Sequence, residues 1–434
     1  MKRTLLTGLI ILVFLGFLEL HPEESRGKKT TLDELIQIAL QQNLQIRAAK
    51  KEWEASLQKI PQAKALPDPV LSYAHFGQSI ETRLGPQRNK ISVSQQIPFF
   101  GKLGLKGEIA AQSSDVLEQQ YHTVKADMVL KVKEAYFSLF LIDRSIRISQ
   151  EEKGVYRRLS EIAAKKYETG QVGQQDALKA QLEISKVTEK LLNYHRVRKA
   201  IVAELNSLMN RETDSLLEET EEFAMPERQI DLEQLISWAR ENRPELRKAQ
   251  SVIQKNRESL NLVKKDYYPD FRIMLDYIDI GAGTSDHPDD GRNAWMASIG
   301  INIPLWRKKL RAAEAEAIIR IKASEDLYEN IENETLSRIH ALYFEIETAR
   351  EQIELYEFSL LPQAEQTLKA SEIGYLTGKV DFLNLLDSER MILTIRNGYF
   401  KVLAELGRSL VRLERLVGQE LYKMNDSSGE EVME

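Results

Sequence analysis

The sequence contains no cysteine, which excludes disulfide bonds, thiol nucleophiles and cysteine-based metal sites. Glycine and proline are sparse and aromatic residues make up only 7% of the chain, a composition that suits long helices. The net charge of −6 is mild, so nothing indicates nucleic-acid binding. No histidine pair has metal-ligand spacing, and no phosphate-binding glycine loop or Gly-x-Ser-x-Gly elbow is present. We therefore expect neither an enzyme nor a bound metal or other cofactor.

Long apolar runs are also scarce, and the clearest one extends from Leu5 to Leu18, directly after Lys2 and Arg3. A short basic region followed by such a core predicts a secretory signal peptide over residues 1–26, with no clear cleavage site. The run is shorter than the about 20 residues that a membrane-spanning helix needs, although an uncleaved anchor is an alternative. Without a cysteine after the run, no lipid can be attached there. No later stretch predicts a spanning helix, so we expect an exported protein without a helical anchor.

The rest of the chain contains one pattern twice. Leu32 matches Leu232, an offset of 200, and Tyr167 matches Tyr375, an offset of 208. Matches that keep one order and nearly one offset indicate a tandem duplication. The predicted divisions are a first repeat over 27–210, an acidic inter-repeat linker over 211–230, a second repeat over 231–419 and a disordered acidic tail over 420–434.

Each repeat has the same predicted plan of a leading helix, a strand pair, a long helix, a turn with glycine and a return helix. The long segments contain only one proline, Pro362, and apolar residues from Tyr121 to Ile146 recur in steps of three and four, which is typical of coiled coils. At 1.5 Å per residue a long helix reaches roughly 100 Å, and a leading or return helix about 55 Å. Two short helices stacked end to end therefore match one long helix, and the chain supplies four columns. The expected helices cover 31–66, 102–168, 174–210, 231–266, 307–374 and 380–418.

Four segments alternate apolar and polar residues, with loops expected at 77–86 and 281–293. Such alternation is typical of barrel strands in a membrane, and also of any half-buried strand. Export and the lack of spanning helices favour the barrel. Four strands cannot close a barrel, and an open edge in lipid is very costly, so subunits must share one. Two chains would give eight strands around a filled interior and three would give twelve around a lumen; a conduit favours the trimer.

Aromatic residues follow an Ile-Pro pair at the end of each hairpin. Phe99, Phe100 and Trp306 are expected to lie at the periplasmic boundary of the membrane as a girdle. Packing at the junction of strand and helix explains Phe99 equally well.

The two turns share the pattern Tyr-x-Thr-Gly-x-Val, at Tyr167–Val172 and Tyr375–Val380. With the duplicated halves and one hairpin per half, this pattern resembles the TolC family of outer-membrane efflux proteins over about residues 30–420. The stretches most similar to its heavy-metal cation efflux branch are Leu66–Val70, Gln96–Leu103 and Gly107-Glu108. The resemblance implies a homotrimer in outer-membrane lipid, with a twelve-strand barrel and a twelve-column helical tunnel. It also implies docking to a periplasmic adaptor protein and an inner-membrane efflux pump.

The resemblance further implies roles for the turns and the helices beside them. Adaptor-contacting tips are expected at Thr169, Gly170, Gln171, Val172, Thr377, Gly378, Lys379 and Val380. Turn chemistry alone fits a plain helix–helix turn as well. In the family, polar links between the two hairpins close this end, and Asp176 and Tyr375 occupy the positions of one such pair. Replacing both, by Ala and Phe, is expected to raise conductance.

Rings of acid on the inner face would favour cations at a constriction. Asp387 matches one ring position of the family, whereas the neighbouring position is Asn384, which departs from a double acid ring. Asp381 could supply charge instead, although acids commonly lie on solvated helix faces.

The prediction is a mainly α-helical chain with a small β part. Long coiled-coil-like helices form a periplasmic tunnel, and four strands contribute to a shared trimeric twelve-strand barrel. The predicted function is a passive outer-membrane channel subunit of a tripartite efflux system, for heavy-metal cations or drugs, with a large periplasmic part. The alternative is a soluble periplasmic coiled-coil scaffold or adaptor protein, which would need no detergent for extraction.

Overall fold

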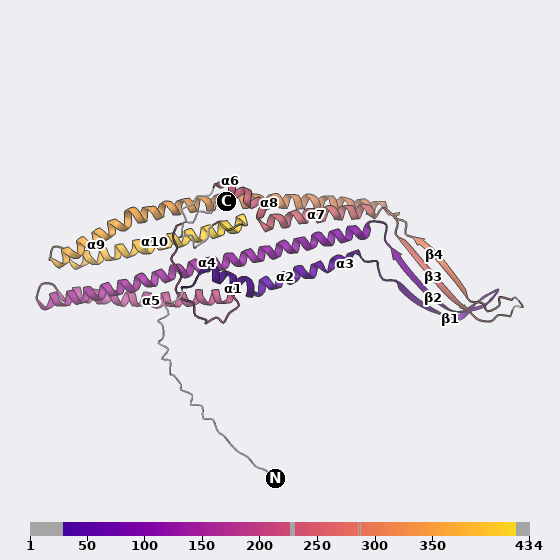
Figure 1. Cartoon of the computed structure of the whole chain (residues 1–434), viewed down its shortest axis with the longest axis horizontal. Coiled ribbons are helices and arrows are strands. Elements are labelled where there is room, and N and C mark those ends of the chain that lie inside the picture. The colour runs from indigo at the N-terminus through magenta and orange to yellow at the C-terminus, as the bar shows by residue number, and fades with distance from the viewer. Residues whose placement is uncertain (1–28, 226–230, 285, 287, 422–434) are drawn as a thin grey trace, which may run out of the picture.

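The molecule is elongated, with helices forming one long body and four strands extending from one end (Figure 1). This computed structural model describes residues 29–225, 231–284, 286 and 288–421. The predicted signal peptide and nearly all of the predicted acidic tail lie outside these residues. Within the described part, no helix is both long and apolar enough to cross a membrane.

The first repeat contains the long helix α4 (Lys102–Glu168), which runs without a break and returns through α5 (Gln174–Leu208). Both helices were expected from the sequence. The predicted coiled-coil seam is largely buried, at Met128, Val132, Ala135, Leu139, Ile142 and Ile146.

The second repeat differs because its long helix is interrupted, although one continuous helix was expected over 307–374. Helix α8 (Arg307–Leu355) passes through a π-helical turn, η1 (Tyr356–Leu360), into α9 (Leu361–Leu376), and α10 (Phe382–Val417) returns. The turn ends two residues before Pro362. A proline inside a helix donates no hydrogen bond and its ring clashes with the preceding turn, so the helix widens there instead of ending.

Neither leading segment is a single helix, so that prediction was wrong. The first divides into α1 (Leu32–Gln42), α2 (Leu44–Leu57) and α3 (Lys59–Lys64), and the second into α6 (Leu232–Asn242) and α7 (Pro244–Lys265). Asn43 has an extended backbone, and its side chain caps α2 by accepting from the amides of Gln45 and Ile46. Arg243 precedes a proline, which disfavours helical backbone at that position.

The breaks create the joints between stacked short helices. The Asn43 side chain donates to the carbonyl of Leu208, at the end of α5, at 2.8 Å. In the second repeat Gly418, just after α10, lies so close to Asn242 that a Cβ would stand 2.7 Å from its carbonyl oxygen. Because α2 with α3, or α7, spans about 30 Å and the return helix about 50 Å, each stack nearly matches the long helix.

The four columns lie in one order across the wall. Helix α4 contacts α2 and α5, and also α7 and α10, while α8 contacts α7 and α10. The outer columns of one chain are therefore α2 with α5 and α8 with α9.

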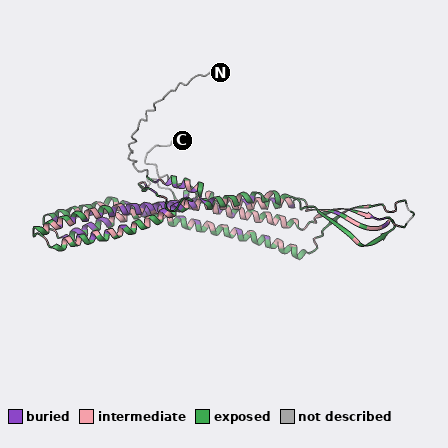
Figure 2. Ribbon diagram, turned by 90° about the horizontal axis from the view of Figure 1, so that it is seen from below, coloured by how far each residue is buried: buried purple, intermediate pink, exposed green. Residues whose placement is uncertain are grey.

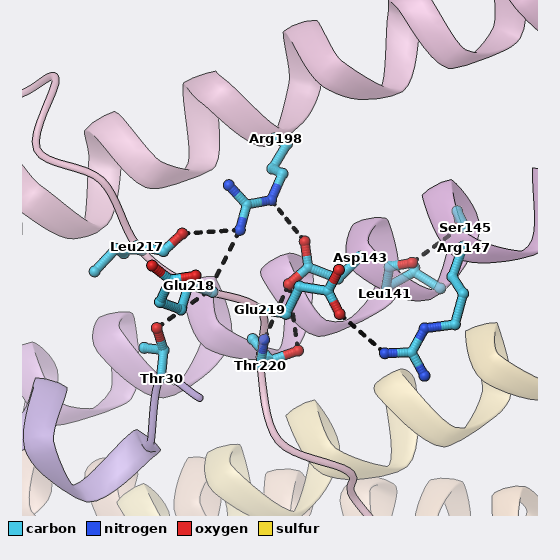
Figure 3. Close-up of polar contacts among 10 residues, drawn as sticks. All are labelled: Thr30, Leu141, Asp143, Ser145, Arg147, Arg198, Leu217, Glu218, Glu219 and Thr220. Atoms are coloured by element: carbon cyan, nitrogen blue, oxygen red, sulfur yellow. Dashed lines mark hydrogen bonds and ion pairs between the residues drawn. The ribbon is translucent and has the colours of Figure 1, made fainter. Parts of the chain in front are cut away.

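Residues 211–225, the described part of the predicted linker, follow α5 and cross the middle of the wall (Figure 1). Buried residues are dense in this middle part (Figure 2). Asp143 of α4 is buried there and holds two segments (Figure 3). Its carboxylate accepts from Arg198 Nε of α5 at 2.7 Å and from the amide of Thr220 at 3.1 Å. Thr30 pairs with Thr220 in a parallel bridge, so the start of the described chain joins the same belt.

The strands β1 (Val70–Thr82), β2 (Gly85–Ile97), β3 (Phe271–Ile280) and β4 (Ala294–Ile301) form one antiparallel sheet in chain order. The first loop is only residues 83–84, not the predicted 77–86, because β1 continues through an irregularity between His75 and Ile80. The second loop lies at 281–293, as expected.

Cross-strand register gives the sheet two different faces. Tyr73, Ile91, Tyr277 and Trp295 form one row, and all four are exposed large apolar side chains. The opposite face carries mainly polar rows, such as Ser72, Ser92 and Asp276, which continues to Met296 on β4. A sheet that exposes a continuous apolar face is not suited to water, and this alternation is the pattern of a barrel strand with lipid outside.

Candidate functional site

The two turns at the far end of the helices have the same backbone geometry. Gly170 and Gly378 have φ of 70° and 72°, a left-handed conformation that favours glycine. In the first turn, the amides of Gly170 and Gln171 donate to the carbonyls of Tyr167 and Lys166. The second turn repeats both bonds 208 residues later, where the amides of Gly378 and Lys379 donate to the carbonyls of Tyr375 and Gly374, so each helix ends in a Schellman motif.

These turns enclose one open cleft with a volume of about 740 Å³. The predicted tip and gate residues that line it are Gln171, Val172, Asp176, Tyr375, Thr377, Gly378, Lys379, Val380, Asp381 and Asn384. Thr169, Gly170 and Asp387 are outside its lining. The structure thus brings most of the predicted site residues together from both repeats, while their roles in docking and gating stay predictions.

Tyr375 and Asp176 lie in this cleft but form no hydrogen bond with each other. Tyr375 is 2% exposed, and its hydroxyl has no hydrogen-bond partner among the described residues. Burial and the nearby Asp176 charge raise the pKa of Tyr375 to about 12. Burial also raises the pKa of Asp176, helped by Asp381 and opposed by Lys179. The two groups are near enough to interact electrostatically, without the direct polar link that the family pattern implies.

A different residue joins the two hairpins at the tip. Lys166 Nζ, in the last turn of α4, donates to the carbonyls of Tyr375 at 2.6 Å and Leu376 at 3.2 Å. The same ammonium lies 4.6 Å from the centre of the Tyr375 ring. A cation at the last carbonyls of α9 also complements the helix dipole. We call these contacts the Lys166 latch; no sequence pattern predicted it.

Three further gate candidates lie along the start of α10. Asp381 caps this helix, since its Oδ1 accepts from the amide of Asn384 at 2.8 Å. Asn384 and Asp387 are exposed, three residues apart on one helical face. The face can therefore present a carboxylate and an amide to a lumen, while Asp381 has a structural role as well.

A second link between the hairpins lies further from the tip. Arg390 Nη2 of α10 donates to Glu183 Oε1 of α5 at 2.6 Å. This guanidinium and the neighbouring Lys186 hold the pKa of Glu183 below its usual range against the opposing effect of burial. The pair ties the second return helix to the first.

Glu389, next to Arg390 in the chain, is 3% exposed. Burial, followed by the negative charge of Glu372, raises the pKa of Glu389 from 4.5 to about 7, while the nearby Arg158 and Arg396 lower it. Burial and the Glu372 charge outweigh the two arginines, so this carboxyl favours its neutral form.

This carboxyl predicts a pH-dependent stability. The native state binds the proton more tightly than the unfolded chain, so stability falls as pH rises from 4.5 to about 7, and the full loss is present above 7. Glu389→Gln removes the loss, and we expect the variant to be roughly 3 kcal/mol more stable at pH 8, with no difference near pH 4. Melting temperatures of the detergent-solubilised protein at both pH values provide the measurement. The exposed Glu351→Gln is the control, and an equal gain at both pH values would contradict the prediction.

The predicted girdle residues lie where the sheet meets the helices. Phe99 stacks on Tyr268, with ring centres 4.6 Å apart, as the packing alternative expects. Phe100 and Trp306 are 76% and 78% exposed. Their place in a membrane boundary stays a prediction.

Among the described residues, no group of three His, Cys, Asp or Glu side chains is placed to hold a metal ion. Comparison with known proteins adds the decisive observation. The family described as outer membrane efflux protein matches residues 35–211 and 235–419, one match for each repeat. The chain belongs to this family.

Individual relatives are distant but match end to end. The chain is 22% identical to the cobalt-zinc-cadmium resistance protein CzcC of Cupriavidus metallidurans, over 92% of both chains. It is 21% identical to the alkaline protease secretion protein AprF of Pseudomonas aeruginosa, over 91% of this chain and 86% of that one. The outer membrane protein VceC of Vibrio cholerae has the same fold, with a TM-score of 0.74, 17% identity and coverage of 89% and 96%.

As an outer membrane efflux protein, the chain is a passive channel and not an enzyme. Its location in the outer membrane, with a large periplasmic part, and its combination of helical tunnel and barrel strands confirm the predictions from the sequence. The alternative of a soluble scaffold is thereby set aside.

Proposed function

We propose that three copies of this efflux protein close one twelve-strand barrel and one twelve-column tunnel. Within the described chain, β1 and β4 each have one neighbouring strand, and the two outer helix columns each have one neighbouring column. Open sheet edges in lipid leave backbone groups unpaired, so the edges need another copy. Eight strands from two copies would enclose a filled interior, whereas twelve leave a lumen.

The tunnel is the conduit of a tripartite efflux system in this proposal. Its tips, formed by the two Schellman turns, meet a periplasmic adaptor, which connects the channel to an inner-membrane pump. The cleft between the turns supports this role, because it exposes donors and acceptors from both hairpins on one surface.

Heavy-metal cations are the proposed cargo. The observation that carries this proposal is the likeness to CzcC over 92% of both chains. The exposed Asp387 supports it, because threefold repetition would make a ring of carboxylates in the tunnel. Likeness to AprF makes a secreted polypeptide the second candidate cargo.

Reversal potentials in planar bilayers across a zinc sulfate gradient test this proposal. We expect the wild-type channel to prefer Zn²⁺ over sulfate, and Asp387→Asn to shift the reversal potential toward zero. The exposed Glu351→Gln, remote from the tip, serves as the control. A channel without cation preference would contradict the metal cargo and favour a polypeptide.

A further inference from the structure

The junction between sheet and helices carries an excess of positive charge that the channel function leaves unexplained. Four segments meet there, at 59–70, 97–108, 262–271 and 303–314, which adjoin the ends of α3, α4, α7 and α8 nearest the strands (Figure 1). They contain ten lysines and arginines but only five acids, although the whole chain has a net charge of −6. We call these ten cations the basic collar: Lys59, Lys64, Lys102, Lys106, Lys264, Lys265, Arg307, Lys308, Lys309 and Arg311.

Helix stability alone does not favour cations at two of these places. Helices α4 and α8 both begin in the collar, and neither has an acidic residue in its first turn. The first turn of α8 instead contains Arg307, Lys308 and Lys309. A helix N-terminus carries partial positive charge and favours acids, so these cations oppose the dipole.

Only part of the collar is neutralised within the chain. Lys102 pairs with Asp266 at 3.1 Å and Asp270 at 2.9 Å, which uses two of the five acids. By contrast, Lys308 and Lys309 are exposed and make no ion pair or hydrogen bond with another described residue.

Further from the strands, along α7 and α8, arginines have acidic partners. Arg320 pairs with Glu316, and Arg257 of α7 pairs with Glu325. The unmatched positive charge is therefore a property of the sheet-proximal ends and not of these helices as a whole.

Apolar side chains lie directly on the sheet side of the collar. Leu305 and Trp306, which precede Arg307, are exposed, and so is Phe100. Beyond them lies the exposed apolar face of the sheet. The order of apolar face, aromatic residues and cations corresponds to the order of hydrocarbon, interface and headgroup phosphates in a bilayer leaflet.

We propose that the basic collar binds the headgroups of anionic phospholipids in the periplasmic leaflet of the outer membrane. The inference rests on the proposed barrel, since only a chain inserted to this depth brings the collar to the phosphates. Lysine and arginine stems lie along apolar surface while their charged ends reach the headgroups, which suits Lys308 and Lys309 next to Trp306. Charge complementarity identifies the lipid class, and the collar holds the barrel at a fixed depth.

Native mass spectrometry of the full-length protein in mild detergent tests the proposal, with phosphatidylglycerol and phosphatidylcholine as probes. We expect the wild-type particle to retain phosphatidylglycerol at least about tenfold better, because each cation near an anionic surface contributes severalfold to affinity. The variant R307Q/K308Q/K309Q/R311Q should reduce the preference to within about twofold. The control K322Q/R338Q/K369Q/K401Q removes four exposed cations from α8, α9 and α10, outside the collar, and should keep the preference.

The outcomes separate this inference from the proposed function. A variant that still conducts in bilayers but loses the lipid preference supports the collar. If wild type and collar variant retain both lipids equally, the collar proposal is overturned while the channel stands. A collar variant with altered ion selectivity and unchanged lipid preference would place these cations in the lumen and also overturn it. The charge-retaining variant K308R/K309R should behave as wild type, and its failure to do so would contradict an electrostatic origin.

Discussion

Replacing Lys166 by Met should open the periplasmic end of the channel. Lys166 donates to two carbonyls at the end of α9, and a hydrogen bond from a charged group contributes about 1.5–3 kcal/mol. This bond stabilises the closed state relative to the open state. Its loss therefore shifts the equilibrium toward the open state about tenfold or more. We therefore expect a clear rise in single-channel conductance or open probability in planar bilayers.

Two comparison variants identify which contact matters. Lys165→Met removes the adjacent exposed ammonium and should leave conductance unchanged. Asp176→Ala with Tyr375→Phe, which the family pattern singles out, should raise conductance less than Lys166→Met, because the structure has no hydrogen bond between these two side chains. A larger effect from the double variant would mean that the family pair, and not the Lys166 latch, holds the end closed.

Asp143→Ala should destabilise the belt by about 4 kcal/mol. The Asp143 side chain is 3% exposed and accepts from Arg198 Nε and the Thr220 amide. Its removal leaves both donors without an acceptor and the guanidinium without its counter-charge, although Arg198 keeps its bonds to the carbonyls of Leu217 and Glu218. In a chain of this size, a loss of that size lowers the melting temperature by several degrees. The measurement is thermal unfolding of the detergent-solubilised protein.

An exposed ion pair provides the matched control. Arg257 and Glu325 are 55% and 43% exposed, so Glu325→Ala should cost less than about 1 kcal/mol. Equal melting temperatures for the two variants would show that the belt is not held by Asp143. In Asp143→Ala, residues 211–225 should detach from the wall. We therefore expect this segment to be the first site of proteolysis in the variant.

The large features of the fold followed from repetition and length. The offset of 200 between Leu32 and Leu232 changes only to 208 at the turns, and helix lengths alone indicated that short helices stack beside α4. The joint at Arg243 could also have been expected, because Pro244 restricts the residue before it. Asn43 was less evident, since its capping geometry depends on the α5 end that it contacts.

The site was only partly predictable for a similar reason. Glycine at the left-handed positions of both turns identified the tips, because local backbone geometry demands it. The Lys166 latch could not be predicted from a local sequence pattern. Its acceptors are backbone carbonyls 209 and 210 residues away, and every residue has a carbonyl. Likewise, Glu389 lies in an otherwise ordinary helical sequence, and only packing reveals that it is buried.

The number of chains in the particle tests the central claim most directly. We would purify the mature protein from outer membranes in mild detergent and determine the mass of the protein component by native mass spectrometry. Three chains per particle are predicted, because twelve strands enclose a lumen. A particle of one or two chains would contradict the shared twelve-strand barrel, and a protein that leaves the membrane without detergent would contradict the channel itself.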